Sequence, residues 1–306
     1  MMVLKVQILK HIQLVAPTDM SVLILGESGT GKEFVARKIH AESNRASKPF
    51  VAIDCGALPK DLAASEFFGH IKGSFTGAVT TKTGQFVEAN KGTLFLDEIG
   101  NLSYDVQIQI LRAIQERKVK PIGGNKEIAV DVRILTATNE DLSQAVVRGN
   151  FREDLYHRLN EFAIEVPNLS SRGEDLHLFA QYFLKEANRE LHRTVEGFDE
   201  DVMMAFGAYS WPGNFRELKN VVRRAVLLSV NNRITLNVLP RVITDNTENE
   251  TVISSDNLKS LKDKLEKQKI IATLEKTRYN KSKAAELLQI DRKTLYNKLK
   301  QFGIEE

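Results

Sequence analysis

A glycine-rich segment directly after a short apolar run constrains the fold of this chain more than any other feature. The run covers residues 22–25, and the segment after it reads Gly-Glu-Ser-Gly-Thr-Gly-Lys. A strand, a glycine-rich turn and a helix in this order place backbone amides and a helix N-terminus around an anionic phosphate. The pattern therefore predicts a phosphate loop, with nucleotide-binding residues Gly26, Glu27, Ser28, Gly29, Thr30, Gly31, Lys32 and Glu33.

Two acidic residues end another apolar run and complete the expected nucleotide site. Residues 93–96 read Thr-Leu-Phe-Leu, and Asp97 and Glu98 follow them. Glu33 stands where a Ser or Thr hydroxyl usually binds Mg²⁺, so the ion has to depend more on Asp97 and water. We expect Asp97 to hold Mg²⁺ and Glu98 to orient and polarise the attacking water. The alternative is a strand that merely ends in two solvated acids.

Short apolar runs alternate with helical patterns along the first half of the chain, which is typical of a parallel sheet covered by helices. From residue 170 to about 239 the apolar positions recur at helical spacing, which predicts an all-helical block. We therefore expect an α/β fold with a nucleotide-binding subdomain at 1–169 and a helical subdomain at 170–243. The predicted strands of the five-stranded parallel sheet are 22–25, 50–53, 93–96, 132–137 and 162–166.

A second glycine-rich string, Gly-Ser-Phe-Thr-Gly-Ala, occupies residues 73–78 and lies between the phosphate loop and the acidic pair. Glycines at 73 and 77 disfavour a regular helix or strand, which predicts that Phe75 and Thr76 lie at the tip of a loop. A nucleotide-driven protein can use such a tip to push a partner. The alternative is that Phe75 fills a local core beside a turn.

The tail of the chain carries the basic surplus. The whole chain has a net charge of +3, whereas residues 255–306 hold 13 Lys and Arg against 8 Asp and Glu. Residues 244–256 are polar and predict a linker. Residues 280–300 predict two helices joined by a tight turn, the second capped by Asp291, within a domain at 257–306. The residues expected to face DNA are Arg292, Lys293, Thr294, Tyr296, Asn297 and Lys298.

An earlier helix at 258–274 would supply a dimer contact and so pair two recognition helices about one DNA turn apart. A palindromic site in double-stranded DNA is therefore expected. Gln289 occupies the turn position where glycine is common. The alternative is a basic helical hairpin whose charged face is only solvated.

These motifs together resemble the AAA+ activators of sigma-54 RNA polymerase, the bacterial enhancer-binding proteins. The string at 73–78 is similar to the Gly-Ala-Phe-Thr-Gly-Ala loop of that family and departs from it only at Ser74. The phosphate loop followed by Glu33 is also how this segment looks in the family. The tail resembles the Fis-type helix-turn-helix domain that ends most of its members. The resemblance therefore implies a P-loop AAA+ fold with a helical lid.

The resemblance also assigns roles to single residues. It implies that Gly73, Phe75, Thr76 and Gly77 contact the sigma factor, and that Asn139, after the strand at 132–137, is the sensor I residue. Arg152 and Arg158 lie six residues apart and match arginine fingers that reach the nucleotide of the neighbouring subunit. The alternative for Arg158 is a helical ion pair with Asp154. Asn214 is expected to cap a helix, with Glu217 completing a capping box. Arg216, in the first turn of that helix, resembles the sensor II arginine.

One departure concerns a proposed switch. The family usually has an asparagine before the cysteine of the segment at 53–58, a residue that restrains the catalytic glutamate, and here Asp54 stands in its place. Two carboxylates at 54 and 98 would repel unless a proton, water or cation intervenes. We therefore expect that the link between the nucleotide site and the loop at 73–78, in the state before hydrolysis, differs from the family pattern.

The resemblance implies a function. We expect an ATPase that uses ATP and Mg²⁺, binds DNA upstream of promoters, and remodels the sigma-54 RNA polymerase closed complex through the loop at 73–78. A homo-oligomeric ring is expected, a hexamer assembled from dimers, in the cytoplasm and with no membrane span. No receiver or sensory domain is expected before the nucleotide domain, although the family belongs largely to two-component systems. The single cysteine, Cys55, excludes an internal disulfide.

Two other classes of function stay open from the sequence. One is a DNA-binding repressor that binds nucleotide only as structure, against which the intact Phe75, Thr76 and Glu98 argue. The other is a generic AAA+ loader or chaperone, which would share the ATP site but has no reason to carry both the loop at 73–78 and a Fis-type tail. Capture of sigma-54 that depends on ATP separates all three.

Overall fold

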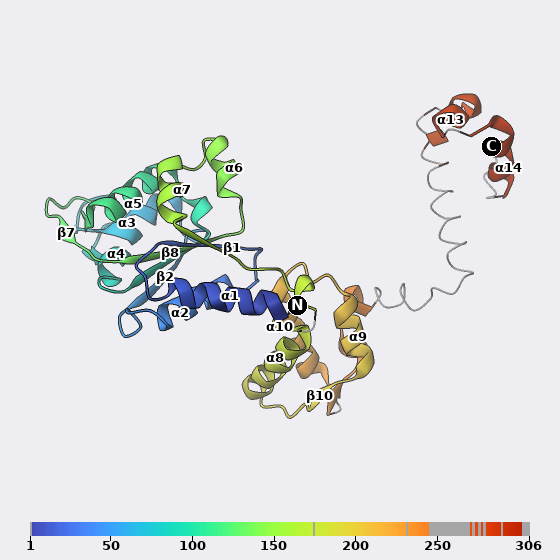
Figure 1. The fold of residues 1–306 in the computed structure, drawn as a ribbon, viewed down its shortest axis with the longest axis horizontal. Coiled ribbons are helices and arrows are strands. Elements are labelled where there is room, and N and C mark those ends of the chain that lie inside the picture. The colour runs from blue at the N-terminus through green and yellow to red at the C-terminus, as the bar shows by residue number, and fades with distance from the viewer. Residues whose placement is uncertain are drawn as a thin grey trace. The chain divides into compact units, whose positions relative to one another are not determined.

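The computed structural model describes residues 2–173, 175–230, 232–244, 270, 273–274, 277, 280–288 and 290–301. The chain forms two compact units, Met1–Leu239 and Pro240–Glu306. The first holds a sheet with its helices and a helical subdomain, and the second holds a pair of helices (Figure 1). The expected domain bounds at 169, 243 and 256 stay predictions.

A five-stranded parallel sheet forms the centre of the first unit, as the sequence predicts (Figure 1). Its strands run in the order β2-β5-β8-β1-β9. Parallel pairing aligns their carboxyl ends: Leu25 of β1 pairs with Thr138 of β8, and Asp54 of β2 pairs with Asp97 of β5. One edge of the sheet therefore gathers the polar residues that follow each strand. The strands are β1 Val22–Leu25, β2 Phe50–Asp54, β5 Thr93–Asp97, β8 Arg133–Thr138 and β9 Phe162–Glu165.

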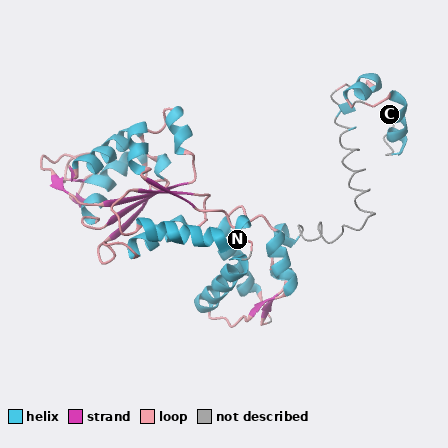
Figure 2. Cartoon of the chain, viewed as in Figure 1, coloured by secondary structure: helices cyan, strands magenta, loops and turns pink. Residues whose placement is uncertain are grey.

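Helices cover both faces of this sheet (Figures 1 and 2). On one face lie α1 Met2–Val15 and α2 Lys32–Ala41, and on the other lie α3 Lys60–Phe68, α5 Tyr104–Glu116, α6 Leu142–Val147 and α7 Glu153–Leu159. Short elements α4 Gln85–Glu88 and η1 Ile99–Asn101 flank β5.

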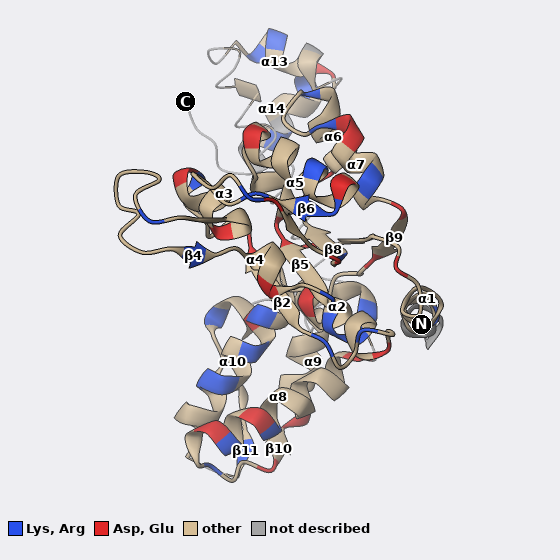
Figure 3. Cartoon of the chain, turned by 90° about the vertical axis from the view of Figure 1, so that its left-hand side faces the viewer, with Lys and Arg blue, Asp and Glu red and all other residues tan. Residues whose placement is uncertain are grey.

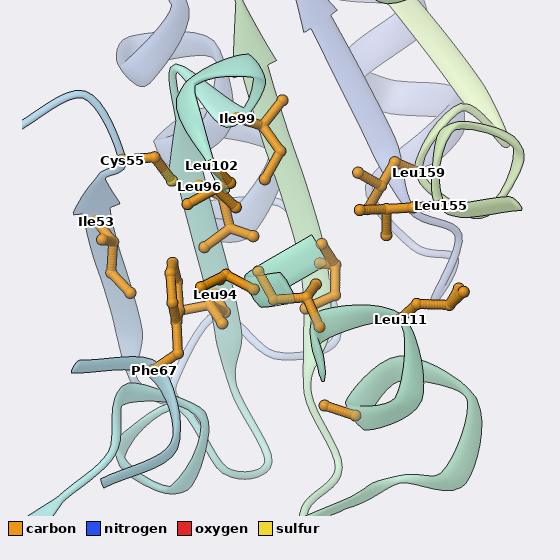
Figure 4. Close-up of a cluster of buried hydrophobic side chains, with 14 of the residues drawn as sticks. Ile53, Cys55, Phe67, Leu94, Leu96, Ile99, Leu102, Leu111, Leu155 and Leu159 are labelled. Carbon is orange, nitrogen blue, oxygen red and sulfur yellow. The ribbon is translucent and has the colours of Figure 1, made fainter. Parts of the chain in front are cut away.

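Strand β5 shows how the two faces are filled. Its Leu94 and Leu96 join the core under α3, α5 and α7 (Figure 4), whereas Phe95 between them joins the core under α1 and α2. Successive side chains of a strand point to opposite faces, so one apolar run packs against both helical layers. The acids that follow this run are fixed in place by a strand that is buried on both sides.

Two short antiparallel hairpins, which the sequence analysis did not predict, flank the loops of the first unit. Strands β3 Gly69–His70 and β4 Lys82–Thr83 enclose the loop that contains residues 73–78, and β6 Lys118–Val119 pairs with β7 Ile128–Ala129. A bridge between His70 and Ile122 joins the two hairpins. Strands of two residues are too short to give a readable alternation of apolar and polar positions.

The helical subdomain consists mainly of α8 Asp175–Leu191, α9 Glu200–Ala208 and α10 Asn214–Leu228, with η2 Ser170–Arg172 and η3 Leu236–Val238. The prediction of an all-helical block was wrong in one detail. Strands β10 Gly197–Phe198 and β11 Arg233–Ile234 form a parallel pair, and their Phe198 and Ile234 side chains are buried.

In the second unit, α13 Lys281–Leu287 and α14 Arg292–Gln301 pack together. The core holds Ala284, Leu295 and Leu299, with Ile270 and Leu274. The sequence pattern also predicts an apolar face of Ala284, Leu287, Leu288, Ile290, Leu295 and Leu299, and this prediction was wrong at Leu287, which is 60% exposed. Most of the expected linker, most of the helix expected at 258–274 and the turn residue Gln289 lie outside the described residues.

Candidate nucleotide site and interaction loops

The phosphate loop (residues 26–32) joins β1 to α2 and is formed around the ammonium group of Lys32. This side chain is buried, and its Nζ donates hydrogen bonds to the carbonyl oxygens of Gly26 at 2.8 Å and Glu27 at 3.0 Å. Thr30 Oγ1 donates to the carbonyl of Glu27 at 2.8 Å. Gly31 has a φ of 91° just before α2, a conformation that favours glycine. The loop therefore has the backbone shape that can surround a phosphate.

Opposite charges share this end of the sheet. Burial lowers the pKa of Lys32, while Asp97 and Glu98 act in the opposite direction. Burial raises the pKa of Asp97, against the hydrogen bond that its Oδ1 accepts from the Glu98 backbone N–H at 3.0 Å. A half-buried carboxylate can bind a hard cation, and the buried ammonium beside it can bind a phosphate. The carboxylate of Glu33 faces elsewhere, because it pairs with Arg37 at 2.7 Å on the exposed side of α2.

Glu98 has an unusual backbone and a defined partner. Its φ is 53°, which is uncommon for a residue with a side chain. Its Oε2 accepts a hydrogen bond from Asn101 Nδ2 at 2.9 Å. Asp54, the proposed switch residue, has other partners. Its Oδ1 accepts hydrogen bonds from the backbone N–H groups of Gly56 at 2.9 Å and Ala57 at 3.3 Å. Glu98 is thus hydrogen-bonded to the side-chain amide of Asn101 in η1, a partner that the sequence analysis missed.

The N-terminus of α10 holds the phosphate loop from the other side. Asn214 is fully buried, and its Nδ2 donates to Glu27 Oε2 at 3.0 Å and to the Ser28 carbonyl at 3.1 Å. The Phe215 backbone N–H donates to the Gly29 carbonyl at 2.9 Å. Arg216, the expected sensor II residue, donates from its guanidinium to Ser28 Oγ at 2.8 Å. The helical subdomain therefore binds both the backbone of the loop and the side chains of Glu27 and Ser28.

The expected role of Asn214 as a helix cap was wrong. Gly213 occupies the position before the helix, and the Asn214 Oδ1 accepts from the backbone N–H of Leu169 at 2.7 Å. The expected capping box is present only on the side of Glu217, which accepts from the Gly213 N–H at 2.9 Å. Asn214 has a φ of 50°, which turns its side chain toward the loop instead of its own helix.

Two further residues that sequence reasoning missed support this contact. Asn168 donates from Nδ2 to Glu27 Oε1 at 3.2 Å, so the Glu27 carboxylate lies between two amides, and the hydrogen bonds from Asn214 and then Asn168 lower its pKa. Arg172 lies over the ring of Phe215 at 4.9 Å and donates to the Pro167 carbonyl at 2.9 Å. Both residues follow β9, and neither belongs to a motif identified in the sequence.

Asn139, the expected sensor I residue, lies close to the phosphate loop. It follows β8, whose last residue, Thr138, accepts a hydrogen bond from the Gly26 N–H at 3.2 Å. Asn139 lines a pocket of about 400 Å³ together with Gly26, Glu27 and Tyr156. Its exposed position at the carboxyl end of β8 agrees with contact to a nucleotide.

The two expected finger arginines lie in different surroundings. Arg152 makes a double hydrogen bond to Asp154, with distances of 2.9 and 2.6 Å, and lies over the ring of Tyr104. Arg158 donates to Glu161 at 2.6 Å, so its alternative pairing with Asp154 was wrong. Glu161 in turn accepts from the Ser21 N–H before β1. Arg158 therefore lies at the amino end of β1, whereas the phosphate loop follows the carboxyl end of that strand.

The tip loop (residues 73–78) is closed by its own backbone. The Gly73 N–H donates to the Ala78 carbonyl at 2.8 Å, and the Ala78 N–H donates to the Phe75 carbonyl at 3.0 Å. Phe75 is half-buried and meets the edge of the His70 ring at 5.0 Å, and Thr76 is exposed. Gly73 and Gly77 have φ values of 81° and 106°. The two glycines thus permit a tight turn with an aromatic side chain near its tip.

In the second unit, the expected DNA-facing residues lie on α14. Asp291 accepts a hydrogen bond from the Thr294 N–H at 3.0 Å, which confirms it as the cap of this helix. Arg292 and Lys293 are exposed, Tyr296 is 45% exposed, and Lys298 is half-buried. Asn297 lies in α14, but its side chain is outside the described part of the chain. Lys and Arg lie on both α13 and α14 (Figure 3), and Lys281 of α13 and Arg292 of α14 lie over the ring of Tyr296, at 5.2 and 5.9 Å.

Three family profiles match the chain in consecutive segments. The sigma-54 interaction domain matches residues 4–165, the AAA+ ATPase lid domain matches 170–256, and the bacterial regulatory protein, Fis family, matches 263–302. The chain belongs to the sigma-54 activator family, the bacterial enhancer-binding proteins. Members of this family with curated names include the transcriptional regulatory protein ZraR and the regulatory protein AtoC.

ZraR of Escherichia coli K12 is 49% identical over 292 residues, which cover 95% of this chain and 66% of ZraR. AtoC of the same strain is 44% identical over 296 residues, which cover 95% of this chain and 64% of AtoC. The chain thus spans about two thirds of the length of these relatives. The crystal structure of NtrX from Brucella abortus in complex with ADP has 32% identity and a TM-score of 0.75, covering 98% of this chain and 68% of NtrX.

The expected fold is therefore confirmed: an AAA+ P-loop α/β domain, a helical lid and a C-terminal helix-turn-helix domain. Within the described ranges, none of the helices is both long and apolar enough to cross a membrane.

Proposed function

We propose that this protein is an ATP-hydrolysing transcriptional activator that binds upstream DNA and remodels the closed complex of sigma-54 RNA polymerase in the cytoplasm. The main support for the proposal is that Lys32, Asp97 and the N-terminus of α10 all lie at the phosphate loop. A lid that grips this loop can respond when the loop changes its contacts with a nucleotide. Family membership supports the same function, and NtrX from Brucella abortus has been solved with ATP and with ADP.

The groups around the phosphate loop support this proposal. Lys32 would exchange its two carbonyl partners for phosphate oxygens, and Arg216 would contribute a second cation. Asn139 lies at the edge of the same region. Glu98, freed from Asn101, would take a proton from the attacking water, the role of a general base.

The residues present also fit a bound Mg²⁺. Asp97 is a half-buried carboxylate at the carboxyl end of β5. Burial raises its pKa, and the nearby Lys32 acts in the opposite direction. Hard cations prefer such oxygen ligands and keep several waters. Asp97 would therefore hold the ion, and bound Mg²⁺ would neutralise charge on the phosphates.

Arg152 and Arg158 support a homo-oligomeric ring, for which we propose a hexamer assembled from dimers. Arg158 lies at the end of β1 opposite to the phosphate loop of its own chain, so the nucleotide that it can reach belongs to a neighbouring subunit. Each arginine has a carboxylate partner that it would have to leave. An arginine finger contributes about 10³ to 10⁵ in rate, which is far more than a surface ion pair contributes.

The tip loop and the tail supply the two macromolecular contacts in this proposal. Phe75 would leave the His70 ring and, with Thr76 and the glycines at 73 and 77, contact sigma-54. The exposed cations of α14 would bind DNA phosphates, and Tyr296 lies beside them for contacts in a groove. Dimeric tails would select a palindromic site.

Capture of purified sigma-54 by the full chain tests this function. We expect capture with ADP and aluminium fluoride, a mimic of the phosphate transition state, and none with ADP alone. Phe75→Ala should lose capture and keep ATP hydrolysis, whereas Glu98→Gln should lower hydrolysis by about 10²-fold or more.

Val79→Ala is the matched control for Phe75→Ala, because Val79 lies just beyond the tip loop and is 75% exposed. It should leave capture unchanged. Absence of capture with the mimic, together with normal ATP hydrolysis, would contradict the contact with sigma-54 and favour a different remodelling target.

A further inference from the structure

The carboxylate of Glu98 lies in a niche that the backbone of Gly56 leaves open. A Cβ atom at position 56 would come to 2.2 Å from Glu98 Oε2 and 3.0 Å from Asn101 Nδ2. Real Cβ atoms essentially never approach another atom as closely as 2.2 Å, and a contact of 3.0 Å is tighter than most. The hydrogen-bonded pair of Glu98 and Asn101 therefore lies directly against the main chain after β2.

The order of the strands shows which way Glu98 faces. Strand β5, which Glu98 follows, lies between β2 and β8, and the phosphate loop follows β1 on the far side of β8. Gly56 follows β2, on the opposite side of β5. A carboxylate that lies against Gly56 is therefore turned away from the phosphate loop. Water that attacks a phosphate in that loop needs the carboxylate on the other side.

Asp54 cannot hold Glu98 in this niche. Its Oδ1 accepts two backbone N–H groups of the turn that follows β2, and an ionised carboxylate has no proton to donate to another one. The amide of Asn101 has two donors, and one of them lies 2.9 Å from Glu98 Oε2. The donor that holds Glu98 thus comes from η1, three residues further along the chain.

We propose that Asn101 is a positioning residue that holds Glu98 withdrawn from the phosphate loop until a bound nucleotide offers a better partner. This inference depends on the proposed function, in which Glu98 activates the attacking water. Gly56 provides the space, and Asn101 provides the hydrogen bond. Loss of either shifts the Glu98 population toward the phosphate loop and raises the rate of hydrolysis without a change in nucleotide affinity.

Steady-state ATP hydrolysis by the full chain tests the proposal. Asn101→Ala removes the donor, and Asn101→Asp keeps the shape while losing the donor. We expect both to raise kcat by about 3- to 10-fold at unchanged KM, the size of effect expected for one hydrogen bond to a charged group at a solvent-exposed position. Gly56→Ala should act in the same direction, because its Cβ would expel the Glu98 carboxylate, whereas the Asn101 amide would have to shift by only a few tenths of an ångström.

Asn44→Ala is the matched control, since Asn44 is an exposed asparagine that donates to the Pro17 carbonyl at 3.0 Å away from the site. It should leave kcat and KM unchanged. An unchanged or lower kcat in both Asn101 variants, at an unchanged melting temperature, would overturn the proposal. A higher kcat in Asp54→Ala alone would place the restraint at position 54 instead.

Glu98→Gln separates this inference from the function beneath it. If Glu98→Gln abolishes hydrolysis and the Asn101 variants behave as wild type, only the role of Asn101 fails. If Glu98→Gln hydrolyses ATP at the normal rate, the catalytic role of Glu98 fails first.

Discussion

Two glycine-rich loops in this protein contain the same residue type for opposite reasons. In the phosphate loop, a Cβ atom on Gly29 would come to 2.5 Å from the Gly213 carbonyl oxygen, so glycine is needed for close packing. In the tip loop, a Cβ atom on Gly73 or Gly77 would meet nothing within 4 Å, so glycine serves only the backbone conformation. The first loop is fixed by its neighbours, and the second is constrained mainly by itself.

Hydrogen bonds show the same contrast. The phosphate loop receives bonds from Asn214, Phe215 and Arg216, which are almost 190 positions away in the sequence, as the separation of 187 between Glu27 and Asn214 shows. The tip loop is closed by bonds between residues at most five positions apart, from Gly73 to Ala78. Local closure allows a loop to change shape without unfolding what surrounds it.

The largest effect is expected from Gly29→Ala. Its φ of 78° adds left-handed strain of about 1–2 kcal/mol to a clash with the lid backbone, so ATP binding should weaken by about 100-fold. Titration with a fluorescent ATP analogue measures this change in affinity. Gly31→Ala is the matched control, because its φ is 91° but its Cβ would meet only the Phe215 ring at 3.7 Å. Equal losses in both variants would mean that strain alone matters and that the packing contrast is false.

The next effect concerns the lid contact. Asn214→Gly tolerates the φ of 50° and removes only the side chain, which leaves the Leu169 N–H and the Ser28 carbonyl without that partner. The free energy of unfolding of the first unit should fall by about 1–3 kcal/mol, as urea denaturation can measure. Asn220→Gly, on the exposed side of the same helix, gives the cost of a helical glycine alone. A loss of free energy no greater than that of Asn220→Gly would show that the Asn214 side chain does not stabilise the lid contact.

A smaller effect is expected where the tip loop packs against Gly123, in the loop between β6 and β7. A Cβ atom on Gly123, whose φ is 75°, would come to 2.5 Å from Ser74 Cβ. Gly123→Ala should therefore speed amide hydrogen exchange across residues 73–78 by about tenfold. Gly124→Ala is the control, because the nearest atom to its Cβ would be the Pro121 carbonyl oxygen at 3.2 Å. Equal exchange rates in the two variants would show that Ser74 is not held by this contact.

The smallest effect on stability is expected at Gly73. Gly73→Ala should lower the midpoint of urea unfolding only slightly, because a loop closed by its own bonds can relax away from the φ of 81°. Gly207→Ala in α9, where a Cβ would also meet nothing within 4 Å, should raise stability by about 0.5–1 kcal/mol. A large fall in the midpoint for Gly73→Ala would erase the difference between the two loops.

The parts of the fold that follow from local pattern were predictable. Each strand of the sheet is an apolar run, and the phosphate loop and the acids at 97 and 98 follow such runs directly. Asp291 caps its helix through a residue three positions later, which is also a local rule.

The missed features depend on contacts between distant segments. Asn214 has the sequence context of a helix cap, but its left-handed backbone turns it toward the phosphate loop. The niche of Glu98 arises because β2 and β5 are neighbours, and no spacing in the sequence reveals that Gly56 faces Glu98. The short pair of β10 and β11 is set by packing at the end of the lid.

The attachment of the lid to the carbonyl groups of Ser28 and Gly29 has one further consequence. Carbonyl groups are common to all amino acids, so these two bonds follow the path of the main chain, whereas the side chains of Glu27 and Ser28 are bound separately. A nucleotide that moves this path by a small amount therefore moves a whole helical subdomain with it.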